Sequence, residues 1–215
     1  MKRKNLAPLT GALFVVLVLV AFFAFGGSTP GGKDSAAKVV SFYKSHNNKQ
    51  IAAAIVLSLA TVPLLYFSAL IRDRGRTALR GRSALPGFAF GGGVVCAAGF
   101  LTAATLHFAL ADYADNIQPA AAQALNAIDN DFFLPLVIGL VTLILATSLM
   151  AIRAGLLPKW LGWVGIVLFV ISFTPVGFIG FALGGLWIII VSILLYVRGE
   201  PVSGAPAQPA VAPQS

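Results

Sequence analysis

One histidine stands in an otherwise uncharged, apolar stretch of the chain. His107 is followed at the end of that stretch by Asp112 and Tyr113, and Asp129 and Asp131 come shortly before the next apolar stretch. An ionisable side chain inside a membrane-crossing helix is costly unless it faces protein or water, so it marks a candidate site. A histidine beside aspartates can relay protons, bind a cation or ligate a metal. These five residues therefore form the candidate polar site.

The favoured interpretation of His107 is a structural role. It continues a row of small residues, Gly92, Cys96, Gly99 and Ala103, at spacings of four, three, four and four. At about 100° per residue these positions fall on one narrow stripe of a helix, where small side chains let a neighbouring helix approach closely. The spacing predicts a packing seam with His107 at its outer end, hydrogen-bonded to a carbonyl or hydroxyl group.

The acidic residues near position 130 suit calcium binding or helix capping. Asp129-Asn130-Asp131 is similar to the start of a calcium-binding loop, but the glycine and the final glutamate of such a loop are missing. A carboxylate just before a helix can accept hydrogen bonds from the first backbone amides and favours the helix dipole. Asp131 is therefore predicted to cap the helix that follows it.

Motifs for catalysis and cofactor binding are missing from the sequence. Glycines 91–93 have no Gly-Lys-Ser or Gly-Lys-Thr after them, and no Gly-x-Ser-x-Gly, His-Glu-x-x-His or Cys-x-x-Cys motif occurs. The single cysteine, Cys96, excludes an intramolecular disulfide and any multi-cysteine metal site. We therefore predict no catalytic residue, no cofactor and no metal.

Five arginines are concentrated between two apolar stretches: Arg72, Arg74, Arg76, Arg80 and Arg82. Basic residues beside a membrane attract anionic lipid headgroups, at about 1 kcal/mol for each residue near the surface. The lipid bilayer, with anionic headgroups at the arginines, is therefore the predicted partner, although membrane orientation alone would also require basic residues here. Nucleic acid is not expected, because aromatic residues are not interleaved with the basic ones.

The composition excludes an ordinary soluble domain. Hydrophobic residues make up 58% of the 215 residues and charged residues 10%, and the mean hydropathy is +0.90. Soluble domains carry about 25% charged residues, so a soluble protein of this composition would have no polar coat. The sequence predicts an all-α bundle of transmembrane helices.

Six stretches are predicted to cross the membrane. One crossing needs about 20 apolar residues, because the hydrocarbon core is about 30 Å thick. Four uncharged stretches meet this requirement, and the fifth, residues 160–197, is nearly twice as long. Pro175 and Gly177 predict a break within it, since proline lacks an amide proton and glycine tolerates the conformation that ends a helix. The predicted spans are residues 6–25, 51–71, 85–111, 132–152, 160–174 and 178–197.

The distribution of lysine and arginine predicts the orientation. With the N-terminus inside, eleven of the fifteen basic residues fall on the inner side, as the positive-inside rule requires. The segment 112–131 holds four aspartates and no basic residue, and is predicted to be an outer loop. The expected location is a bacterial cytoplasmic membrane, with both termini in the cytoplasm.

Two N-terminal segments each have an alternative interpretation. The first 25 residues are similar to a secretory signal, but the apolar part exceeds the usual length of about 7 to 15 residues and no Ala-x-Ala site follows. A retained span is predicted, with a cleaved signal as the alternative. Ala36, Val39, Val40 and Tyr43 have helical spacing, which predicts a short extracytoplasmic amphipathic helix on the membrane surface, or a solvated loop helix.

The chain is predicted to form one domain followed by a tail. Residues 1–199 hold the spans, whereas residues 200–215 are rich in proline and alanine without a periodic apolar face. Such a segment cannot bury enough apolar surface to fold, so a disordered cytoplasmic tail is predicted.

Two segments resemble those of known proteins. Arg153-Ala-Gly-Leu-Leu-Pro-Lys-Trp-Leu-Gly-Trp163 and Val40-Ser-Phe-Tyr-Lys-Ser-His46 resemble segments of small, uncharacterised bacterial multi-span membrane proteins grouped as domains of unknown function. The resemblance covers most of residues 36–197. It implies a membrane location and a helical architecture, and it brings no activity and no functional residues with it.

Three functional hypotheses follow from these features. Packing residues are abundant and catalytic residues scarce, so the leading hypothesis is a non-enzymatic scaffold, interaction or envelope-modulating membrane protein. The first alternative is a small-solute or ion transporter with an outward-facing site near His107. The second is a membrane enzyme that takes a carboxylate from the outer loop.

Overall fold

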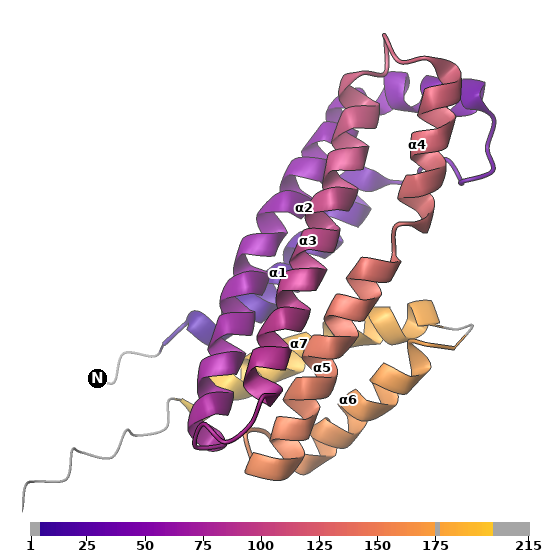
Figure 1. The fold of residues 1–215 in the computed structure, drawn as a ribbon. Helices are drawn as coiled ribbons and strands as arrows, with labels where there is room; N and C mark the ends of the chain where they lie inside the picture. Colours follow the sequence, from indigo (N-terminus) through magenta and orange to yellow (C-terminus); the bar gives the residue numbers. More distant parts are fainter. Residues whose placement is uncertain (1–4, 175–176, 200–215) are drawn as a thin grey trace, which may run out of the picture.

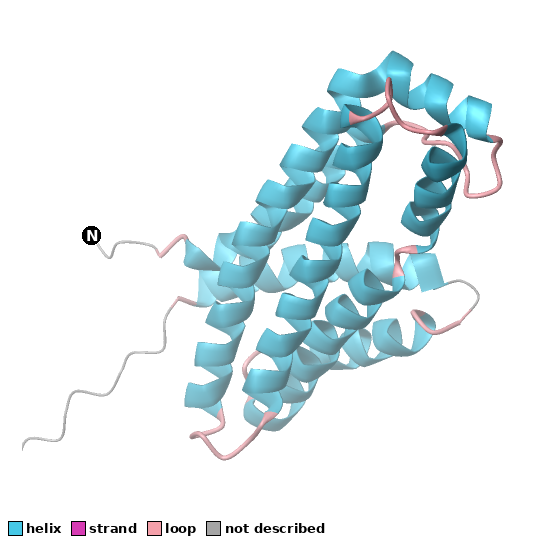
Figure 2. Cartoon of the chain, turned by 45° about the horizontal axis from the view of Figure 1, so that its top comes forward, coloured by secondary structure: helices cyan, strands magenta, loops and turns pink. Residues whose placement is uncertain are grey.

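The computed structural model describes residues 5–174 and 177–199, and every regular element within these ranges is helical (Figures 1 and 2). The predicted all-α helical bundle is confirmed. In chain order the elements are η1 (Ala7–Leu9), α1 (Thr10–Val20), η2 (Ala21–Gly26), α2 (Ala36–Ala78), α3 (Leu85–Asp112), α4 (Pro119–Asp131), α5 (Leu134–Ala154), α6 (Lys159–Ile171) and α7 (Gly177–Arg198).

The first apolar segment begins near a proline and ends at a glycine. Pro8 stands in the first turn, where its missing amide proton costs no hydrogen bond. η1, α1 and the π-helical turn η2 then form one continuous segment of 20 residues, Ala7–Gly26. Gly27 follows it with a φ of +60°, a conformation that favours glycine.

Helix α2 is longer than one membrane crossing needs. Its 43 residues extend about 64 Å at 1.5 Å per residue, against about 30 Å for a hydrocarbon core. Ser35 caps its start by accepting a hydrogen bond from the backbone amide of Lys38. The backbone leaves helical geometry at His46 and then resumes it. The predicted amphipathic helix is therefore the first part of α2, bent against the span that follows.

The segment between α3 and α5 differs from the prediction of a loop. Helix α4 fills most of it, starting with Pro119 in its first turn and ending at Asp131. Helix α5 begins three residues after Asp131, and its N-cap, Phe133, makes no side-chain hydrogen bond. The prediction that Asp131 caps α5 is therefore wrong. Asp131 belongs to the last turn of α4, and the chain turns a corner before α5 begins.

Helix α4 lies beside the ends of α2 and α3 and covers one end of the bundle (Figure 1). We call residues 27–50 and 113–131 the cap. The cap has an apolar core of its own, which the last turn of α3 completes; its buried members are Val39, Tyr43, Leu110, Ala111, Ala114 and Ala122. The cap is thus a small folded unit, outside the apolar stretches of α2 and α5.

The C-terminal helices form the other side of the bundle. Gly155 ends α5 in the left-handed conformation, with a φ of +65°. Helix α6 leads away from this turn and α7 returns, and the Trp187 indole of α7 donates a 3.0 Å hydrogen bond to the Leu161 carbonyl of α6. The predicted break falls between the end of α6 and the start of α7, and Pro175 itself lies outside the described residues.

Five helical segments are long and apolar enough to cross a membrane, and α6, with 13 residues, is a shorter apolar helix at the position of the remaining predicted span. Large apolar side chains are exposed on the outward faces of these helices, for example Leu59, Phe88 and Leu186. Such a surface suits contact with lipid.

The two ends of the bundle carry different side chains. The α2–α3 loop and the α5–α6 turn lie together at the lower end in Figure 1, opposite the cap. The Arg74 guanidinium donates a 3.1 Å hydrogen bond to the Leu195 carbonyl, so the end of α7 is there too. We call the two ends the arginine end and the cap end.

Candidate functional site

The predicted small-residue seam of α3 packs on α5. A methyl group added at Gly92 would lie 2.5 Å from the backbone nitrogen of Leu143, and one added at Gly139 of α5 would lie 2.6 Å from Cα of Cys96. At Gly99 the nearest neighbour is the Leu136 side chain, at 3.1 Å. The two backbones approach this closely because glycine has no side chain.

His107 lies at the end of this seam and meets the cap. Its Nε2 atom is 3.1 Å from Oδ2 of Asp129 on α4. The side chain of His107 is 20% exposed and that of Asp129 only 6%. The structure thus brings together two of the five predicted residues, because α4 folds back over the bundle and turns Asp129 inward.

The remaining three residues are not brought to this pair. Asp112 and Tyr113, at the end of α3, are exposed, and so is Asp131 at the end of α4. Tyr113 has 60% of its surface exposed. These side chains lie on the outer surface of the cap and do not line the site.

Burial governs the electrostatics of the pair. It raises the pKa of Asp129 above its usual value, and the neighbouring His107 opposes that shift. Burial also raises the pKa of the Tyr43 phenol, and the negative charge of Asp129 raises it further. Both groups belong to the cap, where water is excluded and the charged form of an acid is disfavoured.

Three further polar residues of the cap are buried: Tyr43, Gln50 and Asn126, each about 1% exposed. The Tyr43 hydroxyl, Oε1 of Gln50, Oδ1 of Asn126 and Nδ1 of His107 have no hydrogen-bond partner among the described residues. These residues were not predicted from the sequence. A signal was present for Asn126, which precedes Asp129 by three residues and so shares a helix face with it. For Tyr43 and Gln50 there was none, because the backbone leaves helical geometry at His46 between them.

A small cavity reaches His107. Its volume is about 60 Å³, and it is lined mainly by apolar residues of η2 and α2, with Thr29, Gln50 and His107 as its polar members. A buried water needs about 10 to 15 Å³ of such space and several polar partners. The cavity can therefore hold a few waters, which would satisfy Gln50 and His107, and is too small for an organic solute.

The described residues contain no group of three or more His, Cys, Asp or Glu side chains arranged to hold a metal. His107 and Asp129 supply two ligands, whereas protein metal sites ordinarily draw three or four from the chain. The chemistry that the pair supports directly is binding and release of a proton.

Hydrogen bonds between residues far apart in the sequence hold the cap to the segments around it. The Gln50 amide donates to the Gly26 carbonyl at 2.7 Å, and Asn126 donates to the Pro30 and Gly31 carbonyls at 3.3 and 3.1 Å. Similar side-chain bonds join Asn130 to Pro30, Gln123 to Asp34 and Asn47 to Ala111. Each of these bonds ends on a backbone carbonyl of the linker or of a helix end, and the Gly31 and Ala111 carbonyls also accept hydrogen bonds from the Asp34 and Ala114 amides.

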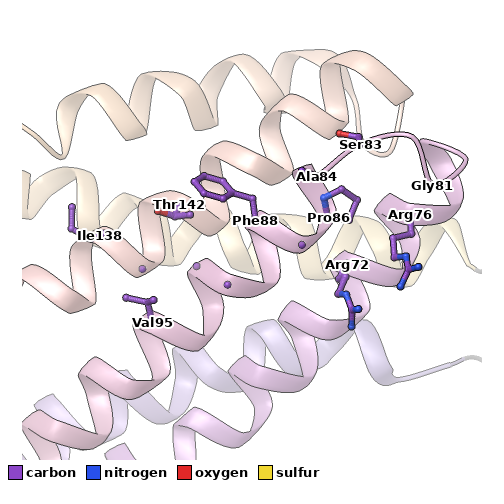
Figure 3. Close-up of a pocket in the computed structure, with 14 residues that line it drawn as sticks. Arg72, Arg76, Gly81, Ser83, Ala84, Pro86, Phe88, Val95, Ile138 and Thr142 are labelled. Carbon is purple, nitrogen blue, oxygen red and sulfur yellow. The ribbon is translucent and has the colours of Figure 1, made fainter.

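The five predicted lipid-contact arginines occupy different positions at the arginine end. Arg74 is directed toward α7, while Arg72 stacks over the Phe90 ring of α3 at 5.5 Å. Arg72 and Arg76 line an open groove (Figure 3), whereas Arg80 and Arg82 are exposed on the α2–α3 loop. The cluster is therefore not one uniform surface.

No family model matches the chain, and neither a curated protein nor a solved structure matches it.

Proposed function

We propose that this chain is a non-enzymatic multi-pass protein of a bacterial cytoplasmic membrane that presents the cap as an interaction or scaffold surface. The observation that carries the proposal is the use of the cap's polar side chains. Gln50, Asn126 and Asn130 all donate hydrogen bonds to backbone carbonyls, so they fix the fold instead of facing a substrate. A rigid cap on a membrane anchor suits recognition of another macromolecule.

The proposed orientation places the arginine end in the cytoplasm and the cap outside. Arg72 to Arg82 and Arg153 lie at the arginine end, and the positive-inside rule assigns such an end to the cytoplasm. The alternation of α1, α2, α3, α5, α6 and α7 between the two ends supports the proposal that both termini are cytoplasmic.

A second candidate function is proton or cation binding from the outer side. It is favoured by the 3.1 Å pair of His107 and Asp129 beside a cavity large enough for water. Histidine and a buried carboxylate with a raised pKa are the groups that proton-coupled membrane proteins use. The small volume restricts this function to protons or small ions.

A flux experiment separates the two proposals. The full chain is reconstituted into vesicles that contain a pH-sensitive dye, and proton and cation flux is measured under an imposed gradient. Under the first proposal, flux equals that of protein-free vesicles, and His107→Ala changes nothing. Saturable flux that is lost in His107→Ala and kept in Asp131→Asn, an exposed control, would replace the scaffold proposal with the second.

A further inference from the structure

An open groove of about 930 Å³ extends along α3 and α5 from the arginine end (Figure 3). Arg72 and Arg76 of α2 lie at its mouth, near the α2–α3 loop. Its opposite end is formed by Val95 of α3 and by Ile138 and Thr142 of α5. The groove is therefore charged at one end and almost entirely apolar along the rest of its length.

Three consecutive glycines of α3 explain how the groove forms. A methyl group at Gly92 would meet the backbone of α5, and one at Gly93 would meet the Ser68 side chain of α2. A methyl group at Gly91 would meet nothing within 4 Å, and the same is true at Gly87, one turn earlier. Gly92 and Gly93 therefore permit helix packing, whereas Gly87 and Gly91 leave space on the lipid-facing side.

The mouth of the groove is positive. Among the described residues, neither Arg72 nor Arg76 has a carboxylate within ion-pair distance, and no acidic residue lines the groove. Stacking on Phe90 orients the Arg72 guanidinium and leaves its N–H edge able to donate hydrogen bonds. The N-terminal end of α3, where Ala84 and Pro86 line the same mouth, adds the positive end of a helix dipole.

The length of the groove matches one leaflet of a bilayer. Its lining on α3 extends from Pro86 to Val95, about 14 Å at 1.5 Å per residue. Half of a hydrocarbon core of about 30 Å is nearly the same length. A ligand that fills the groove must then combine a negative headgroup with a long apolar chain.

We propose that the groove binds one anionic phospholipid from the leaflet at the arginine end. Its phosphate lies between Arg72 and Arg76, and one acyl chain lies along Gly87 and Gly91 against Ile138. The Thr142 hydroxyl, toward the end of the groove opposite the arginines, is the one polar side chain beside that acyl chain among the residues that line the groove.

Native mass spectrometry of the full chain in detergent tests this assignment. The protein is titrated with phosphatidylglycerol or with phosphatidylcholine of identical acyl chains, and the fraction carrying one lipid is measured. Phosphatidylglycerol should bind saturably at one site and more tightly than phosphatidylcholine. Arg72→Gln and Arg76→Gln should each weaken it about fivefold, since a basic residue near a membrane surface contributes about that factor.

Two matched controls distinguish a site from general surface charge and general apolar contact. Arg82→Gln removes an arginine of the same loop that does not line the groove, and it should leave the affinity unchanged. A Cβ atom at position 91 meets nothing within 4 Å, so Gly91→Leu places its side chain in the groove and should abolish retention of both lipids. Ala98→Leu places the same side chain at an exposed position of α3 outside the groove. It should leave the retention of both lipids unchanged. Gly87→Leu repeats the blockage if Gly91→Leu does not fold.

Three results would overturn the proposal. Equal affinity for both lipids would show that the arginines do not hold the phosphate, and an equal loss in Arg82→Gln would show diffuse attraction. Displacement of the lipid by inorganic phosphate alone would show that the acyl chain contributes nothing. A dimer that excludes lipid and dissociates in Gly91→Leu would assign the groove to a second copy of the chain.

Discussion

The carboxylate of Asp129 is buried in the cap, and within residues 5–174 and 177–199 His107 is the one side chain that forms an ion pair with it. Burial favours the protonated acid, whereas a charged imidazole favours the ionised form. Burial is the larger effect, so the pKa of Asp129 is raised in the folded protein. The folded chain therefore binds this proton more tightly than the unfolded chain does, and ionisation of Asp129 lowers stability.

Asp129→Asn should remove a pH dependence of stability. The stabilising effect of protonated Asp129 is fully present below its unfolded pKa of about 3.9 and is lost as the pH rises through the raised folded pKa. Asparagine does not titrate, so the melting temperature of the variant in detergent should fall less than that of wild type as the pH rises from about 4.

His107→Gln should steepen the fall of the melting temperature with rising pH, because it removes the imidazole that opposes the rise in the pKa of Asp129. Asp131→Asn changes an exposed carboxylate and should follow wild type. Identical profiles for Asp129→Asn and wild type would mean that Asp129 ionises without cost to the fold.

At the scale of elements, α3 is central because α2 and α5 both pack on it. Its glycines at 91 and 92 are neighbours in sequence but face different surroundings. Gly92 faces backbone atoms of α5, including the Gly139 carbonyl oxygen at 2.8 Å from an added methyl group, and Gly91 faces open space. The two positions therefore predict opposite results for the same substitution.

Gly92→Ala should destabilise the protein and Gly91→Ala should not. The methyl group at position 92 forces α3 and α5 apart, and overpacking of this kind costs about 1 to 3 kcal/mol. At position 91 the higher helix propensity of alanine favours the folded state by up to about 1 kcal/mol. Thermal unfolding of both variants in detergent measures the difference, and equal melting temperatures would contradict the close α3–α5 contact.

The cap depends on Asn126. This buried residue donates hydrogen bonds to the Pro30 and Gly31 carbonyls of the linker before α2, and each hydrogen bond that is lost costs about 0.5 to 1.5 kcal/mol. Asn126→Ala should therefore lower the melting temperature and expose residues 27–35 to proteolysis. Gln118→Ala, at an exposed position without a side-chain capping bond, should do neither. Unchanged proteolysis in Asn126→Ala would show that the linker is held by other contacts.

The sequence predicted the elements that depend on local pattern. The uncharged stretches coincide with apolar helices, and their bounds agree within three residues except at α2, which extends from Ala36 to Ala78 around the predicted 51–71. The spacing from Gly92 to Ala103 identified a seam that packs on α5. Helix α4 was missed because the aspartates of the segment were interpreted as those of an outer loop, although its apolar residues do share one helix face. Its position depends on contacts such as Asn126 with Gly31, far away in sequence. The same contact was needed to identify which of the four aspartates of residues 112–131 is the partner of His107.

For the whole molecule, the orientation can be tested by single-cysteine labelling in a Cys96→Ala background. Thr77 and Ala124 are both exposed, at the arginine end and on the cap respectively. An impermeant thiol reagent added outside intact cells should label cysteine at Ala124 and spare cysteine at Thr77, because the positive-inside rule keeps the arginine end in the cytoplasm. Labelling at Thr77 alone would invert the orientation.

In the membrane location proposed above, helix α6 imposes a condition on the surrounding bilayer. Its 13 residues extend about 20 Å, roughly 10 Å less than an average hydrocarbon core, whereas its neighbour α5 has 21 residues and extends about 32 Å. Lipids adjust to such hydrophobic mismatch by thinning locally, at a modest cost for each ångström. The membrane around this protein should therefore be dimpled on the side of α6 alone, and the chain should accumulate where the bilayer is thin.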